Sequence, residues 1–269
     1  MGDECCPGWR SVPRPPVFRK QPREVDMKVT TMRLEFREAR DEQEFMKLQD
    51  VRVRSYRNSH LSGILEDDGK FCKHDSLSFH YGLFEETSRR AVGYLRVTPY
   101  SETVSPALPF LEYADSVQIA EVVRGLASRT PLVEATRLSL VPDERAKGWA
   151  RHLVDSAIAI HKVGAGESSI VICHKSHAAF YRRLGYRIVF EDHPFRVPGD
   201  IGGVTLIGPF HTEGSPRLER LTAMSEAFIT DGRIGFDENG FVIPKPKIVA
   251  MPRRVAAERG WGESTGTWG

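Results

Sequence analysis

Apolar and polar residues follow their clearest pattern in the middle of the chain. The segment PLVEATRLSLV (131–141) is rich in strand-forming residues and predicts a β-strand. Apolar residues then recur every three or four positions, which predicts a helix that ends at GAG (164–166). Three further segments, an apolar run, a helical segment and another apolar run, follow at 168–173, 176–185 and 186–190. This order predicts a crossover connection and a parallel pair of strands within a mixed sheet.

Elements on either side enlarge the predicted sheet. Two β-rich runs separated by a charged turn, at 78–84 and 91–97, predict an antiparallel hairpin. Strand composition also occurs at 29–36 and 203–208, and helices are predicted at 38–56, within 105–127 and from Ser215 to about Phe228. We therefore expect an α/β fold of the mixed α+β type, a central twisted mixed sheet flanked by helices.

The chain divides into four predicted parts. Residues 1–25 hold five prolines and five basic residues without periodicity, so we expect a flexible arm. A main domain at 26–212 is followed by a C-terminal extension of helix and hairpin at 213–255 and by a disordered tail at 256–269.

Composition and charge exclude several classes of protein. With 40% hydrophobic and 28% charged residues, the chain is not collagen-like, a coiled-coil rod or wholly disordered. The net charge, 38 − 36 = +2, indicates no nucleic-acid partner. The cysteines lack zinc-ligand spacing, so no metal is expected. No run approaches the roughly 20 apolar residues of a membrane span, and we expect a cytoplasmic protein with reduced thiols and no transmembrane segment.

The most specific motif, R-x-x-G-x-A, lies between the central strand and the helix after it, at residues 145–150. The first turn of a helix leaves N–H groups unpaired at the positive end of its dipole, and Gly148 lets a phosphate approach the backbone. Arg145 and Lys147 add positive charge. The alternative is an ordinary helix start with a glycine that serves packing. As an anion site, the motif suits a phosphate of coenzyme A or phosphopantetheine.

This motif resembles the acyl-donor motif of GNAT-superfamily acyltransferases. FYRRLGY (180–186) resembles a later helix of the same superfamily. The resemblance implies a GNAT-like fold with splayed central strands, and it implies that Tyr181 protonates the departing thiolate; an aromatic at the core edge is the alternative for Tyr181. It also implies donor contacts from Leu140, Val141, Arg145, Ala146, Lys147, Gly148, Trp149 and Ala150.

Two more motifs resemble the N-acyl amino acid synthases and autoinducer synthases, a branch that takes long acyl chains, usually from acyl carrier protein. Glu134 to Arg137 resembles its E-x-x-R, and Gly93 to Arg96 resembles its G-x-x-R. Loose matches to its upstream positions are Arg52, Arg54, Tyr56 and Asp75. The early-loop tryptophan of the autoinducer synthases has no clear counterpart, so we expect an amino acid rather than S-adenosylmethionine as acceptor. The resemblance covers roughly residues 40–210.

The predicted reaction is direct aminolysis of a thioester. Glu134 would accept the amine proton, with a pKa raised by burial. Strand positions three apart face opposite sides, so contact between Glu134 and Arg137 requires a bulge. Backbone N–H groups exposed there, around Leu138 and Ser139, would stabilise the oxyanion. Arg96 or Arg137 would bind the acceptor carboxylate. Structural ion pairs are the alternative for Glu134 and Arg137.

The charge near the donor motif suggests a carrier. Residues 142–187 hold eight Lys/Arg and four Asp/Glu, or 8 − 4 = +4. A basic face could bind acyl carrier protein, or it could bind only the phosphates of coenzyme A. The residues concerned are Arg145, Lys147, Arg151, Arg182 and Arg183. We expect no tightly bound cofactor: acyl-phosphopantetheine or acyl-CoA would be a donor substrate.

The predicted function is therefore transfer of a medium or long acyl chain to the amine of an amino acid. One alternative is a GNAT acetyltransferase that uses acetyl-CoA on a small amine or a protein. Another is a non-catalytic sensor that binds an acyl thioester. A cysteine nucleophile at Cys173 is disfavoured, because the adjacent His174 would point to the opposite face of a strand.

Overall fold

The structure, a computed structural model, describes residues 33–57, 74–100, 117–143, 148–194, 202–237 and 239–242. Within these ranges the strands form one nine-stranded sheet in the order β6-β7-β5-β4-β3-β2-β1-β8-β9. The strands are β1 (Leu34–Glu38), β2 (Phe79–Glu85), β3 (Ala91–Pro99), β4 (Leu132–Leu140), β5 (Ser168–His174), β6 (Arg187–Pro194), β7 (Gly202–Gly208), β8 (Ile234–Asp237) and β9 (Gly240–Val242). The predicted arm 1–25, the predicted tail 256–269 and the motif residues 145–147 lie outside the described residues.

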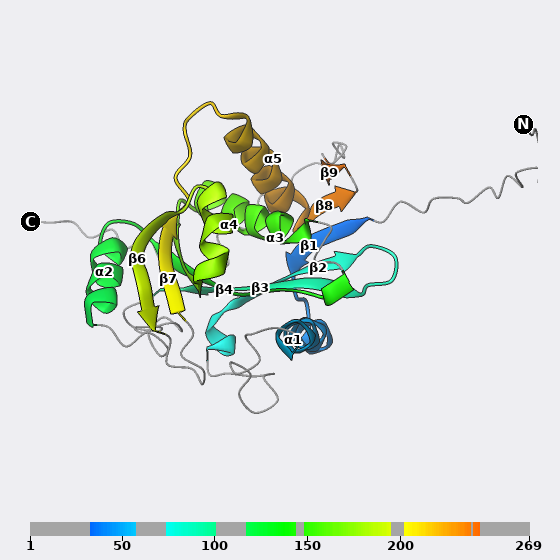
Figure 1. Cartoon of the computed structure of the whole chain (residues 1–269). Helices are drawn as coiled ribbons and strands as arrows, with labels where there is room; N and C mark the ends of the chain where they lie inside the picture. Colours follow the sequence, from blue (N-terminus) through cyan, green and yellow to red (C-terminus); the bar gives the residue numbers. More distant parts are fainter. Residues whose placement is uncertain are drawn as a thin grey trace, which may run out of the picture. The chain divides into compact units, whose positions relative to one another are not determined.

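Helices cover both faces of the sheet (Figure 1). On one face lies α1 (Glu42–Arg57), and on the other lie α3 (Trp149–Ala157) and α5 (Pro216–Asp231). The remaining helices are α2 (Val117–Ala127) and α4 (Ala178–Arg183). None of these described helices is both long enough and apolar enough to cross a membrane. The predicted fold, a mixed sheet flanked by helices, is confirmed.

Two features of the helical elements extend the sequence prediction. The helix after β4 continues from α3 into a π-helical segment, Ile158–Gly164, before it ends. Ser215 begins α5 as predicted, because its side chain accepts a hydrogen bond from the Leu218 N–H at 3.3 Å.

The chain that follows α5 returns to the sheet, where β8 pairs with β1.

The central strand β4 contains a bulge. Across β3 and β4, Tyr94 pairs with Ser139 and Arg96 pairs with Thr136, so one residue of β3 faces two residues of β4. Arg137, inside the bulge, has a φ of +60°, in the left-handed region that non-glycine residues rarely adopt. The bulge therefore redirects the side chains of β4 in the middle of the sheet.

Strands β4 and β5 diverge beside this bulge. They form the predicted parallel pair, but they pair only from Leu132 to Glu134 and from Ser168 to Ile170. Beyond Glu134, β4 continues on β3 alone, and β5 continues antiparallel on β7. The splayed central strands expected from the resemblance are thus present, and the gap between them opens next to Glu134.

Candidate active site

Side chains of β4 separate onto the two faces of the sheet. Val133 and Ala135 line a pocket on the α3 face. Glu134 lies between them in sequence, so strand alternation directs it to the α1 face, where it is fully buried. Arg96 of β3 pairs with Thr136, two residues further along β4, and therefore shares the face of Glu134.

A carboxylate joins two of the predicted arginines on this α1 face. Asp75 Oδ1 accepts hydrogen bonds from Arg96 Nη1 at 2.9 Å and from Arg137 Nη1 at 2.8 Å. Arg96 Nε also donates to Thr136 Oγ1 at 3.0 Å. An unbroken strand would direct Arg137 to the opposite face from Glu134. Because of the bulge, Arg137 reaches the same carboxylate as Arg96, and the predicted arginine pair is brought together.

A chain of polar contacts extends from the Asp75 backbone to α1. His80 interacts through Nε2 with the Asp75 backbone oxygen at 2.8 Å and through Nδ1 with the Tyr94 hydroxyl at 2.9 Å. Gln49 of α1 donates to the same hydroxyl at 3.3 Å. Burial lowers the pKa of His80 and raises the pKa of Tyr94, so both side chains are uncharged near neutral pH. Sequence analysis missed these three residues, because no local motif marks them.

Arg52 and Arg54 of α1, which loosely match upstream positions of the synthase branch, differ in burial. Arg52 is buried, and its Nη1 lies 3.5 Å from Gln49 Oε1. Its guanidinium lies 5.8 Å from the centre of the Tyr56 ring. Burial, followed by the nearby charge of Arg137, lowers the pKa of Arg52. Arg54 is exposed. The described cluster on the α1 face therefore contains Arg52 but not Arg54.

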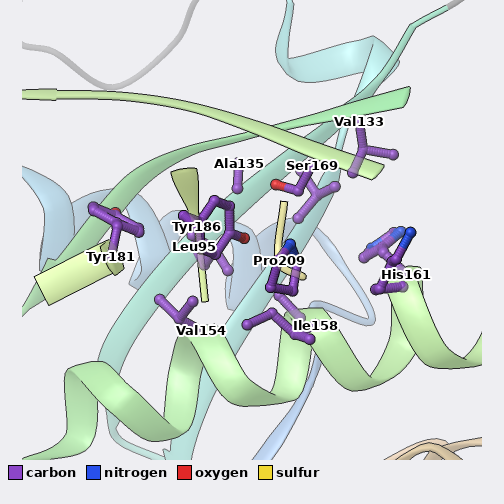
Figure 2. Close-up of a pocket in the computed structure, with 13 residues that line it drawn as sticks. Leu95, Val133, Ala135, Val154, Ile158, His161, Ser169, Tyr181, Tyr186 and Pro209 are labelled. Carbon is purple, nitrogen blue, oxygen red and sulfur yellow. The ribbon is translucent and has the colours of Figure 1, made fainter. Parts of the chain in front are cut away.

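The α3 face holds a mainly apolar pocket (Figure 2). Its enclosed cavity is small, about 10 Å³, which is close to the room that one water molecule needs, so a longer ligand would have to displace lining side chains. Its apolar walls come from the sheet and from the continuous α3 and π-helical segment. The principal apolar lining residues are Leu95, Val97, Ala135, Val154, Ala157 and Ile158.

Two buried tyrosines lie at the α4 side of this pocket. Tyr181, the predicted proton donor, and Tyr186 both line it, with ring centres 5.6 Å apart in an edge-to-face arrangement. Burial raises the pKa of Tyr181 well above its ordinary value and raises that of Tyr186 to about 12. Both phenols therefore keep their protons near neutral pH. The same shift makes Tyr181 a weaker acid, so proton donation to a thiolate depends on close contact within the pocket.

The predicted donor-binding segment is described only at its two ends. Leu140 and Val141 are buried, and the Val141 N–H donates to the Val92 carbonyl oxygen at 3.0 Å. Gly148 begins α3 with a φ of +76°, and among the residues that the structure describes no atom beyond its chain neighbours lies within 4 Å of the position that a Cβ would occupy. This open approach to the helix start is compatible with a phosphate.

The residues after Gly148 and inside the bulge have packing roles. Trp149 is buried beside His152, with ring centres 5.3 Å apart, and Ala150 is half-buried. Ser139 donates its hydroxyl to the Arg137 carbonyl oxygen at 2.8 Å, which stabilises the bulge, while Leu138 is half-buried. Because these side chains hold the backbone in place, the contacts to the donor phosphate and to the oxyanion would come from backbone N–H groups.

The discounted nucleophile remains unsuited to catalysis. Cys173 is buried, and burial raises its pKa to about 12, so little thiolate forms near neutral pH. His174 instead pairs with Ser176, through Nδ1 and Oγ at 2.7 Å. Across the described ranges, no group of three or more His, Cys, Asp or Glu side chains is arranged to hold a metal ion.

Comparisons with known proteins agree with this geometry at the level of the fold. No protein-family model matches the sequence, and no curated protein matches it. The structure is similar to FeeM, an N-acyl amino acid synthase from uncultured soil microbes, with a TM-score of 0.53 and 13% identity over 67% of this chain and 91% of that chain. It also matches an agmatine N-acetyltransferase, with a TM-score of 0.47 and 16% identity over 66% of this chain and 99% of that chain. The described part of the chain has the GNAT acyltransferase fold that its motifs predict.

Proposed function

We propose that this protein is an N-acyltransferase that moves a medium or long acyl chain from a thioester to the amine of an amino acid. The observation that carries the proposal is the divergence of β4 and β5 next to Glu134. This gap lies between an apolar pocket on the α3 face and a charged cluster on the α1 face. Such an arrangement suits a reaction between one apolar and one polar substrate.

The donor would occupy the α3 face. Backbone N–H groups at the start of α3 would bind a phosphate of coenzyme A or of a phosphopantetheine arm. The arm would enter between β4 and β5, and the acyl chain would lie in the pocket lined by Val154 and Ile158. Removal of a long alkyl chain from water would supply much of the binding free energy, at about 0.8 kcal/mol per buried CH₂.

The acceptor would occupy the α1 face. Arg96 and Arg137 bring two positive charges to Asp75, whose hydrogen bonds orient both guanidinium groups, and the buried Arg52 adds a third positive charge near Arg137. A positive field of this kind favours the carboxylate of an amino acid, which a guanidinium can bind with two parallel hydrogen bonds. A simple amine would gain nothing from the same field.

The proposed chemistry uses one residue from each face. Glu134 accepts a proton from the ammonium group, directly or through water, and the amine attacks the thioester carbonyl. Backbone N–H groups near Leu138 stabilise the oxyanion as the C–N bond forms; the newly bonded nitrogen then releases its second proton to solvent and the C–S bond breaks. Tyr181 protonates the departing thiolate and regains its proton through solvent from Glu134.

Mass spectrometry of lipid extracts from an expressing bacterial host tests this proposal. The wild-type chain should produce new N-acyl amino acids, and Glu134→Gln should lower their formation by about 10²–10⁴-fold. Glu226→Gln, which removes an exposed carboxylate from α5, is the matched control and should leave the products unchanged. Tight binding of acyl-CoA without any turnover by the purified protein would instead indicate a sensor.

A further inference from the structure

One polar side chain of the pocket has no role in the proposed chemistry. His161, on the π-helical segment, is 7% exposed and lines the pocket. Its Nδ1 lies 2.6 Å from Glu167 Oε2. The rings of Phe79 and Tyr81 pack against the imidazole, with centres 5.8 Å and 5.7 Å away. The imidazole is therefore held in one orientation by a hydrogen-bonded carboxylate and two aromatic rings.

The second nitrogen of this imidazole is unsatisfied. His161 Nε2 is buried and makes no hydrogen bond with any described residue. A buried polar atom without a partner costs about 1–3 kcal/mol, and native proteins retain few of them. Phenylalanine or leucine would fill the same space in an apolar pocket without this cost. The imidazole is consequently explained best by a bound group that completes its hydrogen bonding.

The position of His161 indicates which part of a ligand it meets. Tyr181 and Val154 lie together at one end of the pocket, and His161 lies at the other end (Figure 2). Val154 and His161 are seven residues apart on the continuous segment of α3 and π-helix, which places them about two helical turns from one another. Because Tyr181 is the proposed proton donor to the thiolate, His161 would meet an acyl chain far from its thioester.

We propose that the pocket selects an acyl chain that carries a hydroxyl group in its distal part, hydrogen-bonded to His161 Nε2. This inference rests on the proposed function. A hydroxyl both donates and accepts, so it satisfies Nε2 whether the imidazole is neutral or protonated. An unsubstituted chain would leave Nε2 unpaired. Glu167 would repel a terminal carboxylate, whereas Lys162, which also lines the pocket, would attract it, so a carboxylate-bearing chain is the competing ligand in the test below.

Steady-state kinetics with acyl-CoA donors of one fixed length test this selection. The panel contains the unsubstituted chain, chains with a hydroxyl at successive carbons, and a chain with a terminal carboxylate. For the wild-type protein, kcat/KM should be about tenfold or more higher for a donor with a distal hydroxyl than for the unsubstituted donor. Equal values, or a preference for a hydroxyl at the third carbon or for the carboxylate, would overturn the proposal.

Three variants assign the selectivity to His161. His161→Phe keeps an aromatic ring but removes Nε2, so it should bring the ratio of kcat/KM for the hydroxylated and unsubstituted donors to about one. Glu167→Gln, which alters the partner of Nδ1, should weaken the preference and provides a second variant if His161→Phe folds poorly. His152→Phe on the same helix is the control, because His152 does not line the pocket. A preference that survives in His161→Phe would exclude this residue.

A binding measurement separates this inference from the proposed function. Thermal denaturation with free fatty acids of equal length should show greater stabilisation of the wild type by the distal hydroxy acid, and this difference should disappear in His161→Phe. If no donor is turned over but the difference is present, the proposed function fails and the pocket assignment stands. If unsubstituted donors react and the difference is absent, the pocket assignment alone fails.

Discussion

Arg137 adopts a φ of +60°, and this single backbone conformation brings its guanidinium to Asp75. The sequence predicts that Glu134 and Arg137 would face opposite sides of an unbroken strand, so that only a bulge could direct both side chains to one face. The structure contains that bulge. The partner of Arg137, however, comes from a segment 62 residues earlier in the chain, and no local pattern near β4 indicates it.

Burial fixes the protonation state of Tyr181. Its raised pKa keeps the phenol protonated at neutral pH, so Tyr181 cannot act as a base, and its role as a donor depends on contact with the thiolate. Tyr181→Phe should therefore lower kcat by about 10²–10⁴-fold in a purified acyl-transfer assay. Because the raised pKa lies above the assay range, the wild-type rate should show no loss from tyrosine ionisation up to about pH 10.

Tyr186→Phe is the matched control for that substitution. Tyr186 is equally buried in the same pocket, and its pKa is also raised, to about 12, but it has no role in the proposed reaction. Its loss should leave kcat within about threefold of wild type. Equal effects of the two substitutions, at similar melting temperatures, would remove Tyr181 from the mechanism.

Helix α5 is attached to α3 through one buried carboxylate. Asp155 of α3, 1% exposed, accepts hydrogen bonds from Arg217 Nη2 at 2.7 Å and from Arg220 Nη2 at 2.5 Å. Phe228 of α5 also packs against Tyr81, which in turn contacts the His161 ring. The docking of α5 therefore influences the distal end of the pocket as well as the stability of the fold.

Asp155→Asn should destabilise the protein by about 2–3 kcal/mol, because two partly buried guanidinium groups lose their counter-charge. Urea denaturation at pH 7 measures this free energy of unfolding. Asp231→Asn, at the exposed C-terminal end of α5, is the control and should change stability by less than about 0.5 kcal/mol. A similar small change at both positions would show that the carboxylate does not hold α5 in place.

The charge of the whole molecule is nearly balanced, but its basic residues are unevenly distributed. The chain carries +2, whereas residues 142–187 alone carry +4. Among the described residues of that segment, Arg151, Arg182 and Arg183 are exposed on α3 and α4. These helices flank the gap through which the donor would enter, so an acidic carrier protein could dock beside it.

The KM for acyl carrier protein and the KM for acyl-CoA should therefore respond differently to salt. Raising ionic strength should increase KM steeply for acyl carrier protein and only weakly for acyl-CoA of the same chain length. Arg182→Glu should raise KM for the carrier protein about tenfold, while Arg129→Glu, an exposed change after α2, should have little effect. Parallel salt dependences for both donors would argue that the basic face binds only coenzyme A.

The sequence by itself determined the order of elements around the crossover, since hydrophobic periodicity reports which residues must leave water. Local motifs also identified Tyr181, the glycine at the start of α3 and the need for a bulge in β4. Each of these features depends on residues that lie close together in the sequence.

Tertiary structure decided which distant side chains meet. Asp75 meets Arg96 of β3 and Arg137 of β4, and Gln49 of α1 meets Tyr94 of β3, only when these elements pack together. The isolated Nε2 of His161 is likewise invisible in sequence, because a histidine on a helix face acquires an unpaired nitrogen only from what surrounds it. Packing across the sheet, rather than any local preference, produces both the charged cluster and the polar end of the pocket.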